Sequence, residues 1–123
     1  MRTSMIAAVC VAALLVACGG DAGGANTSPM PTPGPVVTSA TVAATPAIQF
    51  TPAIVNLAVG GTIEFDFGSV PHNVYFDDAP PGAPANITAP SFSTRVDRTF
   101  LTPGRYVYNC HLHPGMSGVI VVQ

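Results

Sequence analysis

Short runs of alternating apolar and polar residues follow one another from about residue 47 to the end of the chain. Ile63, Phe65 and Phe67 alternate with Glu64 and Asp66, and this period of two places one face of a strand in a core and the other in water. No helical period continues for three turns. The pattern predicts an all-β fold with strands at residues 47–50, 54–59, 62–67, 72–76, 86–88, 93–100, 104–110 and 117–122.

Turn residues between these runs indicate how the strands connect. Gly60-Gly61 separates two of them and tolerates positive φ angles, so we expect a hairpin there. Short strands at this spacing are typical of an antiparallel β-sandwich with Greek-key connections, here formed by residues 47–123. Alternation predicts that Tyr106, Tyr108 and Cys110 point inward, with Tyr106 in the position of a tyrosine corner.

The stretch before this domain has a different composition. Residues 18–46 consist almost entirely of Gly, Ala, Thr, Ser, Pro and Val, and no apolar period of 2 or 3.6 runs through them. Such a segment has too few large apolar groups to offset the entropy of ordering, and its prolines stiffen it. We therefore expect a flexible linker over residues 18–46.

The first 17 residues have the features of a signal peptide. Arg2 precedes a short apolar run, and Leu15-Val16-Ala17-Cys18 ends that run with small residues before a cysteine. This segment resembles a bacterial lipoprotein signal peptide, and its apolar run is too short for a membrane-spanning helix. The resemblance implies cleavage before Cys18 and attachment of lipid to its thiol, so we expect the protein to be held at a membrane of the bacterial cell envelope, facing the periplasm or the exterior.

The composition excludes nucleic-acid binding as a function and argues against a fold held together by disulfides. Charged residues make up only 8% of the chain, with four Lys and Arg residues in total, so nucleic-acid binding has no electrostatic basis. The three cysteines, Cys10, Cys18 and Cys110, have unrelated surroundings, which argues against a disulfide framework. Cys10 would be lost with the leader, which leaves Cys110 as a thiol of the folded domain.

The neighbours of Cys110 indicate a metal site. Cys110, His113 and Met116 follow one another at intervals of three residues, and Pro114-Gly115 bends the chain between the last two. Thiolate, imidazole and thioether donors are the set that copper favours. A fourth donor must come from another strand, and His72 is the histidine outside this segment. The alternative for Cys110, a buried apolar residue, is weakened by these neighbours.

Two motifs resemble the blue-copper proteins, the cupredoxin family. Pro71-His72-Asn73-Val74-Tyr75-Phe76-Asp77 is similar to the region of plastocyanin that carries its first histidine ligand. Gly104-Arg105-Tyr106-Val107-Tyr108-Asn109-Cys110 is similar to the strand that leads to its cysteine. The spacing of two residues between Cys and His, and between His and Met, resembles that of amicyanin.

The resemblance implies the ligands of one type 1 copper ion. His72, Cys110 and His113 would form the trigonal set, and Met116 would be the weak axial ligand. Asn73 would donate its backbone N–H to the Cys110 sulfur and tie the two loops through its side chain, which tunes the site without binding the metal. Asn73 has the alternative reading of an ordinary polar residue at the start of a strand.

Two residues depart from the family pattern. Asn109 stands where plastocyanin has an aromatic residue, so a second exit for electrons through that side chain is in doubt. His111 follows Cys110 directly, as in multicopper oxidases, but those enzymes need many more histidines than the three in this chain. We expect His111 to be a solvent-facing loop residue.

The predicted function is transport of single electrons through a Cu(II)/Cu(I) centre, with His113 as the exit. We expect a monomer that is not an enzyme, has no small-molecule substrate and meets a redox partner such as a cytochrome briefly. Asp77 and Asp78 could steer a basic partner or could simply form a solvated turn. The alternative function is periplasmic copper buffering or delivery, and a small copper enzyme comes third because it would need a second or open copper site.

Overall fold

The structure, a computed structural model, describes residues 34–123, so the predicted leader, Cys18 and the first part of the linker lie outside the described residues. The described part contains eight strands and no helix, and hence no helix that could cross a membrane. The strands are β1 (Val37–Thr45), β2 (Gln49–Thr51), β3 (Ile54–Phe67), β4 (His72–Asp78), β5 (Ile87–Ser91), β6 (Thr94–Thr99), β7 (Gly104–Asn109) and β8 (Ser117–Val122). The all-β prediction is confirmed.

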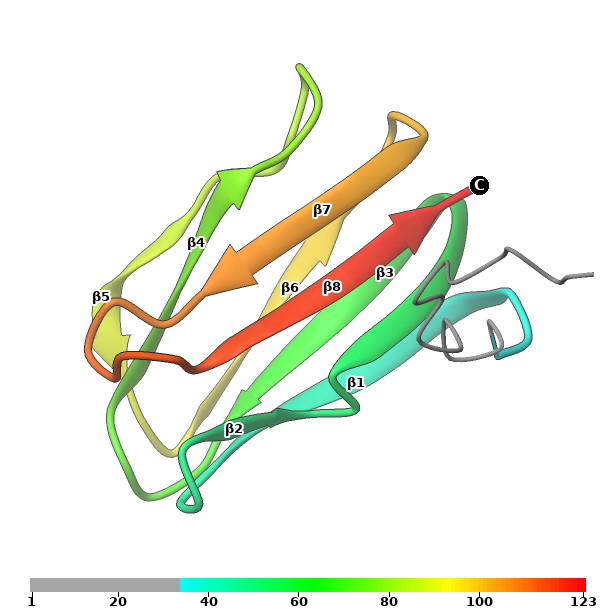
Figure 1. Cartoon of the computed structure of the whole chain (residues 1–123). Helices are drawn as coiled ribbons and strands as arrows, with labels where there is room; N and C mark the ends of the chain where they lie inside the picture. Colours follow the sequence, from blue (N-terminus) through cyan, green and yellow to red (C-terminus); the bar gives the residue numbers. More distant parts are fainter. Residues whose placement is uncertain (1–33) are drawn as a thin grey trace, which may run out of the picture. The chain divides into compact units, whose positions relative to one another are not determined.

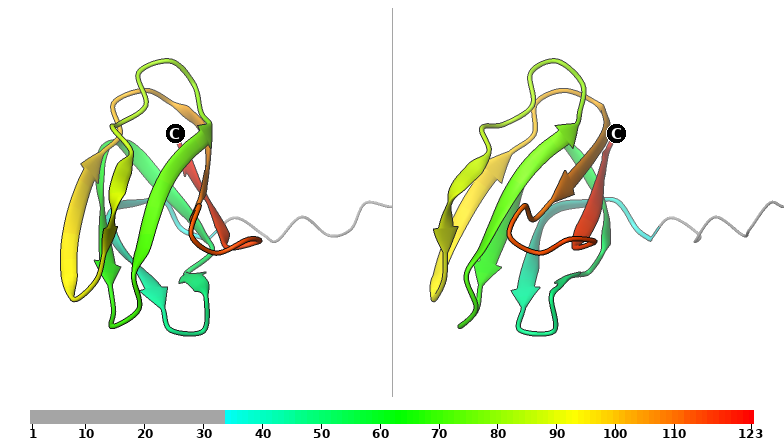
Figure 2. Two further views of the ribbon diagram at one scale, coloured as in Figure 1. Left: turned by 90° about the vertical axis from the view of Figure 1, so that its left-hand side faces the viewer. Right: turned by 60° about the vertical axis from the view of Figure 1, so that its left-hand side comes forward.

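The strands form two layers that pack face to face (Figures 1 and 2). One layer contains β2, β1, the second half of β3 and β6, and the other contains the first half of β3 followed by β8, β7, β4 and β5. β3 therefore belongs to both layers. β1 and β8 each run parallel to β3, while the other pairs are antiparallel as predicted, an arrangement consistent with a Greek-key sandwich.

The folded domain begins earlier than the sequence predicts. Residues 37–45, assigned above to the linker, form β1, and Ser39–Ala44 pair with Thr62–Phe67 of β3. Val42 and Ala44 are buried in the core. Alanine and threonine give weak hydrophobic contrast, so the period of two was invisible in this stretch, and only the partner strand reveals it. The linker prediction is wrong for these residues.

The predicted hairpin at Gly60-Gly61 does not form. The chain passes through both glycines as one long strand, because the residues before them pair with β8 and those after them pair with β1 and β6. Gly60 has a φ of 82°. A hairpin and a bulge both need this left-handed conformation, so the local sequence cannot separate them.

The core lies between the layers, and seven of the eight strands contribute to it, together with Phe100, Cys110 and Met116 from the connecting segments. Within the strands, buried side chains alternate with exposed ones, as the period of two predicts. The largest buried side chains are Leu57, Ile63, Phe65, Phe67, His72, Phe100, Tyr106, Tyr108 and Ile120.

Two tyrosines on β7 are buried side by side on the same face but differ in their hydrogen bonding. The Tyr106 hydroxyl donates to the carbonyl oxygen of Thr102 at 2.6 Å, which confirms the predicted tyrosine corner. The Tyr108 hydroxyl has no partner within the described residues. Burial raises the pKa of Tyr108, since a phenolate cannot be solvated there.

The two hydroxyls are therefore expected to affect stability in opposite directions. Tyr106→Phe should lower the free energy of unfolding by about 0.5–1.5 kcal/mol, because it removes the hydrogen bond to the Thr102 carbonyl. Tyr108→Phe should leave that free energy unchanged or raise it, because it removes a buried hydroxyl that has no partner. Urea unfolding of both variants checks this, and equal destabilisation by the two substitutions would contradict it.

Candidate metal centre

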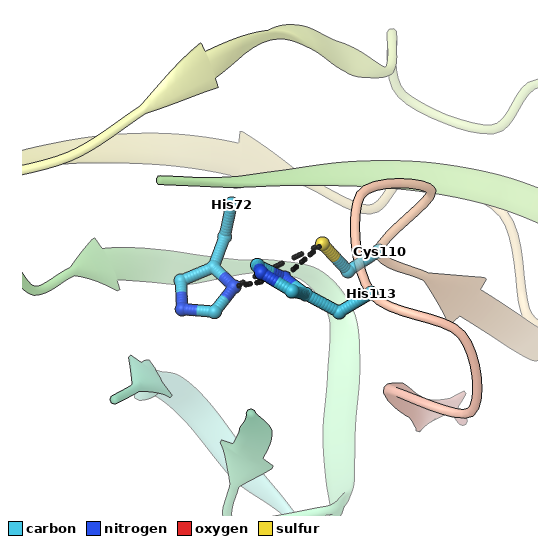
Figure 3. A group of neighbouring side chains, drawn as sticks. All are labelled: His72, Cys110 and His113. Carbon is cyan, nitrogen blue, oxygen red and sulfur yellow. Dashed lines mark hydrogen bonds between the residues drawn. The ribbon is translucent and has the colours of Figure 1, made fainter. Parts of the chain in front are cut away.

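Three donor atoms from two parts of the fold meet at one end of the sandwich (Figure 3). His72 is the first residue of β4, Cys110 follows the last residue of β7, and His113 lies in the loop between β7 and β8. Nδ1 of His72 lies 3.1 Å from Nδ1 of His113 and 3.8 Å from Sγ of Cys110, and His113 Nδ1 lies 3.4 Å from that sulfur. The sequence predicted these three residues as ligands, and the structure brings them together.

The triangle of donor atoms has the size of a metal site. A point equidistant from the three atoms lies about 2.0 Å from each, which matches the roughly 2.0 Å bond from zinc to an imidazole nitrogen and is slightly short of its roughly 2.3 Å bond to sulfur. Nδ1 is the converging nitrogen of both rings. His72 and Cys110 are buried, so a metal here would be shielded from solvent, and His113 alone of the three is partly exposed.

Backbone hydrogen bonds close the loop that carries the ligands. The Cys110 N–H donates to the Met116 carbonyl at 2.9 Å, and the Met116 N–H donates to the His113 carbonyl at 3.2 Å. Gly115 takes a φ of 84°, which lets the chain turn back. Met116 thus returns to the base of the loop with only 2% of its surface exposed. Its role as the axial ligand stays a prediction.

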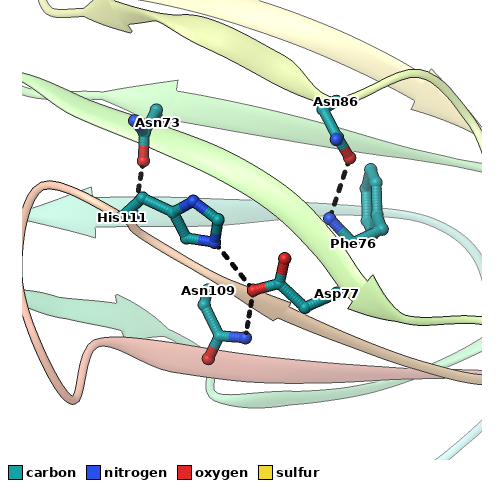
Figure 4. Close-up of polar contacts among 6 residues, drawn as sticks. All are labelled: Asn73, Phe76, Asp77, Asn86, Asn109 and His111. Atoms are coloured by element: carbon teal, nitrogen blue, oxygen red, sulfur yellow. Dashed lines mark hydrogen bonds and ion pairs between the residues drawn. The ribbon is translucent and has the colours of Figure 1, made fainter.

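Asn73 ties the two ligand-bearing segments together. Its side-chain oxygen accepts the backbone N–H of His111 at 2.7 Å, so β4 holds the residue that follows Cys110 (Figure 4). This is the side-chain tie that the resemblance implied. The proposed bond from the Asn73 N–H to the Cys110 sulfur stays a prediction.

His111 lies outside the donor triangle, as expected. Its ring stacks on Tyr75 with centroids 3.9 Å apart and an angle of 6° between the planes. Its Nε2 lies 2.8 Å from a carboxylate oxygen of Asp77, and that same oxygen accepts the side-chain N–H of Asn109 at 2.8 Å. Sequence reasoning missed these contacts, although alternation places Tyr75, Asp77 and Asn109 on outward faces of their strands.

The surroundings of His72 favour its neutral form. Burial lowers the pKa of His72 below its ordinary value of 6.5, and repulsion from His113 lowers this pKa further. The backbone carbonyl of Thr45 opposes both effects. A neutral imidazole has the free lone pair that a metal ligand requires, so the site is ready to bind a metal at neutral pH.

We expect the metal-free protein to lose stability as pH falls through about 6.5. The unfolded state protonates His72 near its ordinary pKa of 6.5, whereas the folded state protonates it only at lower pH. The unfolded state therefore binds more protons in this window, and acid shifts the equilibrium toward it. Urea unfolding of the metal-free protein at several pH values checks this.

The matching control is His72→Gln, which should show a smaller dependence on pH over the same window. Asp77 does not titrate in this window, because its pKa is lowered from an ordinary value of 3.8. A metal-free protein whose stability is constant or rises on acidification through pH 6.5 would contradict the prediction.

Comparison with known proteins agrees with the fold and the site. Residues 37–123 match the family model described as copper binding proteins, plastocyanin/azurin family. The matched segment starts at the first residue of β1, which supports the earlier domain boundary seen in the structure.

Two relatives and one solved structure illustrate the range of similar proteins. The chain is 34% identical over 86 residues to plastocyanin of Prochlorothrix hollandica, covering 60% of this chain and 63% of that one. It is 34% identical over 85 residues to the copper-containing nitrite reductase of Neisseria meningitidis serogroup A, covering 57% of this chain but only 22% of the reductase. A mutant of amicyanin in its reduced Cu(I) form superimposes with a TM-score of 0.60 at 25% identity, over 69% of this chain and 82% of amicyanin. The donor triangle, the fold and the family model all agree. The chain belongs to the plastocyanin/azurin family of copper binding proteins.

Proposed function

We propose that this protein carries single electrons between redox partners, with copper held by His72, Cys110, His113 and Met116. The observation that supports the proposal best is the triangle of two imidazole nitrogens and one cysteine sulfur within 3.8 Å of one another, in a largely buried place. Copper bound by two histidines, a cysteine and a distant thioether supplies a one-electron Cu(II)/Cu(I) couple.

The scaffold is suited to keeping the donors still while the charge of the site changes. His72 begins a buried strand, and the loop that carries Cys110 and His113 is closed by its own backbone hydrogen bonds. Asn73 ties the loop to that strand. A site held in this way needs little rearrangement between oxidation states, which favours rapid electron transfer.

His113 is the proposed exit for the electron, because it is the part of the triangle that reaches the surface. The residues next to His72 and His113 in the chain, Pro71, Leu112, Pro114 and Gly115, are all exposed and mainly apolar. Such residues fit a brief encounter of small area with another redox protein such as a cytochrome. Attachment through lipid on Cys18 would keep this encounter close to a membrane of the cell envelope.

An enzymatic role receives less support. The chain spans 22% of the nitrite reductases that it matches, and among the described residues the group that could hold a metal consists of His72, Cys110 and His113. His111 is occupied by Asp77 and Tyr75. We therefore propose a carrier without a substrate of its own.

The test compares electron exchange with copper transfer. In a stopped-flow experiment, the chain loaded with Cu(II) should be reduced rapidly by a reduced c-type cytochrome. The Cu(I) form should be reoxidised by an oxidised cytochrome, and the copper should stay bound in both reactions. Slow exchange combined with loss of copper to a metal-free acceptor protein would instead support copper buffering or delivery.

A further inference from the structure

A single carboxylate oxygen holds both neighbours of Cys110 in the chain (Figure 4). The side-chain N–H of Asn109 donates to Oδ2 of Asp77 at 2.8 Å, and Nε2 of His111 lies 2.8 Å from the same oxygen. Cys110 is the residue between them, and its side chain points to the opposite, buried face. We call Asp77, Asn109 and His111 the Asp77 clamp.

An irregularity in β4 brings Asp77 to this position. Tyr75 pairs with Asn109 and Asp78 pairs with Val107, so β4 has one residue more than β7 between these two pairs. A bulge of this kind bends the strand and redirects a side chain, and such bulges are frequent beside functional sites. Here the bulge lies where the Asp77 carboxylate reaches the end of β7.

One strand therefore supplies a ligand and both of the restraints on the opposite segment. β4 carries His72 in the donor triangle, Asn73 on the backbone of His111, and Asp77 on the side chains of Asn109 and His111. The position of the Cys110 sulfur relative to the His72 nitrogen depends on how β7 sits against β4. The Asp77 clamp joins β4 to the residue before Cys110 and to the residue after it.

Stability alone does not account for this arrangement. The side chains of Asp77 and His111 are 42% and 47% exposed, and an ion pair so open to solvent contributes little to folding. The ring of His111 is nevertheless held flat against Tyr75, which keeps Nε2 directed at the carboxylate. Hydrogen bonds from His111 and Asn109 lower the pKa of Asp77, so the acceptor stays ionised at neutral pH.

We propose that Asp77 is a positioning residue of the copper site, which fixes the Cys110 sulfur against the His72 nitrogen by holding Asn109 and His111. The inference concerns the geometry of the donors and does not depend on the electron-carrier function. Residues that orient metal ligands without touching the metal typically change metal affinity by about 10-fold to 100-fold when they are replaced.

Asp77→Ala tests this in the full chain, with Asp78→Ala as the matched control. Both variants remove one exposed carboxylate from neighbouring positions of β4, so the general effect of lost charge on copper is nearly the same in both. Asp77→Ala should weaken Cu(I) affinity by about tenfold or more in competition with a chelator. It should also shift the thiolate charge-transfer band and the copper hyperfine splitting of the Cu(II) form, whereas Asp78→Ala leaves all three readouts close to those of the parent.

Two further variants separate positioning from folding. His111→Phe keeps a ring to stack on Tyr75 but removes the nitrogen that meets Asp77, and should reproduce part of the spectral shift. Asp77→Asn keeps one acceptor oxygen and should restore part of the affinity. Urea unfolding of the metal-free variants should show Asp77→Ala folded, with a midpoint close to that of Asp78→Ala.

Identical spectra and affinities for Asp77→Ala and Asp78→Ala would overturn the proposal. It would equally be overturned if the loss of affinity in Asp77→Ala only followed a loss of folding stability, with unchanged spectra in the fraction that stays folded. Neither result would bear on whether the parent protein exchanges electrons with a cytochrome.

Discussion

Cys110→Ser is expected to abolish the blue colour of the copper-loaded protein and to lower copper affinity by more than about 100-fold, beyond the range for residues that only orient ligands. The Cys110 sulfur lies 3.4 and 3.8 Å from the two imidazole nitrogens, and a serine hydroxyl is a harder donor that stays protonated at neutral pH. Without the sulfur, copper would meet two nitrogens and at most a thioether. Visible and EPR spectra of the loaded variant, together with a chelator competition, measure both effects.

Cys18→Ser is the control for the thiol, since Cys18 lies in the segment before the folded domain. It should keep the colour and the affinity of the parent, and on the lipoprotein prediction it should release the protein from membranes. A blue Cys110→Ser variant, or a parent that binds Cu(II) in a colourless tetragonal site, would contradict the assignment of the ligands.

Gly118→Ala is expected to be the most damaging small substitution in the fold. A Cβ atom at Gly118 would overlap both Cζ and Oη of Tyr108, a clash that no relaxation of the methyl group can relieve. The ring of Tyr108 is held edge-on against Phe50 and Phe65, at centroid distances of 4.9 and 5.4 Å, so it has little freedom to withdraw. We expect a loss of about 3 kcal/mol in the free energy of unfolding, the upper part of the range for overpacked cores.

Gly34→Ala is the matched control, because a Cβ atom there meets nothing within 4 Å. It should change the urea midpoint very little. Tyr108→Leu would remove the ring that collides with the new methyl group, so the double variant with Gly118→Ala should be more stable than the sum of the single effects predicts. An unchanged midpoint in Gly118→Ala, or strictly additive effects, would contradict this account.

The fold class was predictable from the sequence because alternation in several strands is strong. Ile63, Phe65 and Phe67 contrast sharply with Glu64 and Asp66, and all three apolar side chains are buried. β1 was missed because its small residues show no such contrast, although Val42 and Ala44 lie in the core. The hairpin at Gly60-Gly61 was wrongly predicted because the direction of the chain after a flexible turn depends on partner strands far away in the sequence.

Some residues of the metal site were also predictable from the sequence, and others were not. Cys110, His113 and Met116 lie within seven residues, so their chemistry and spacing were readable without any structure. His72 was inferred as the missing donor, and the structure places its Nδ1 3.1 Å from that of His113. The contacts among Tyr75, Asp77, Asn109 and His111 were not readable, since each residue alone is an ordinary polar or aromatic position.

The ligand segment shows what the sequence determined by itself and what it could not. Donor types, their order and the turn at Pro114-Gly115 are local properties, because they depend on residue chemistry and on backbone conformations a few residues long. Only the tertiary structure decided that β4 meets the end of β7, that a bulge directs Asp77 to both neighbours of Cys110, and that Asn73 holds His111. The physical reason is that register and bulges arise from pairing between strands more than thirty residues apart along the chain, and no local pattern encodes a distance across the sheet.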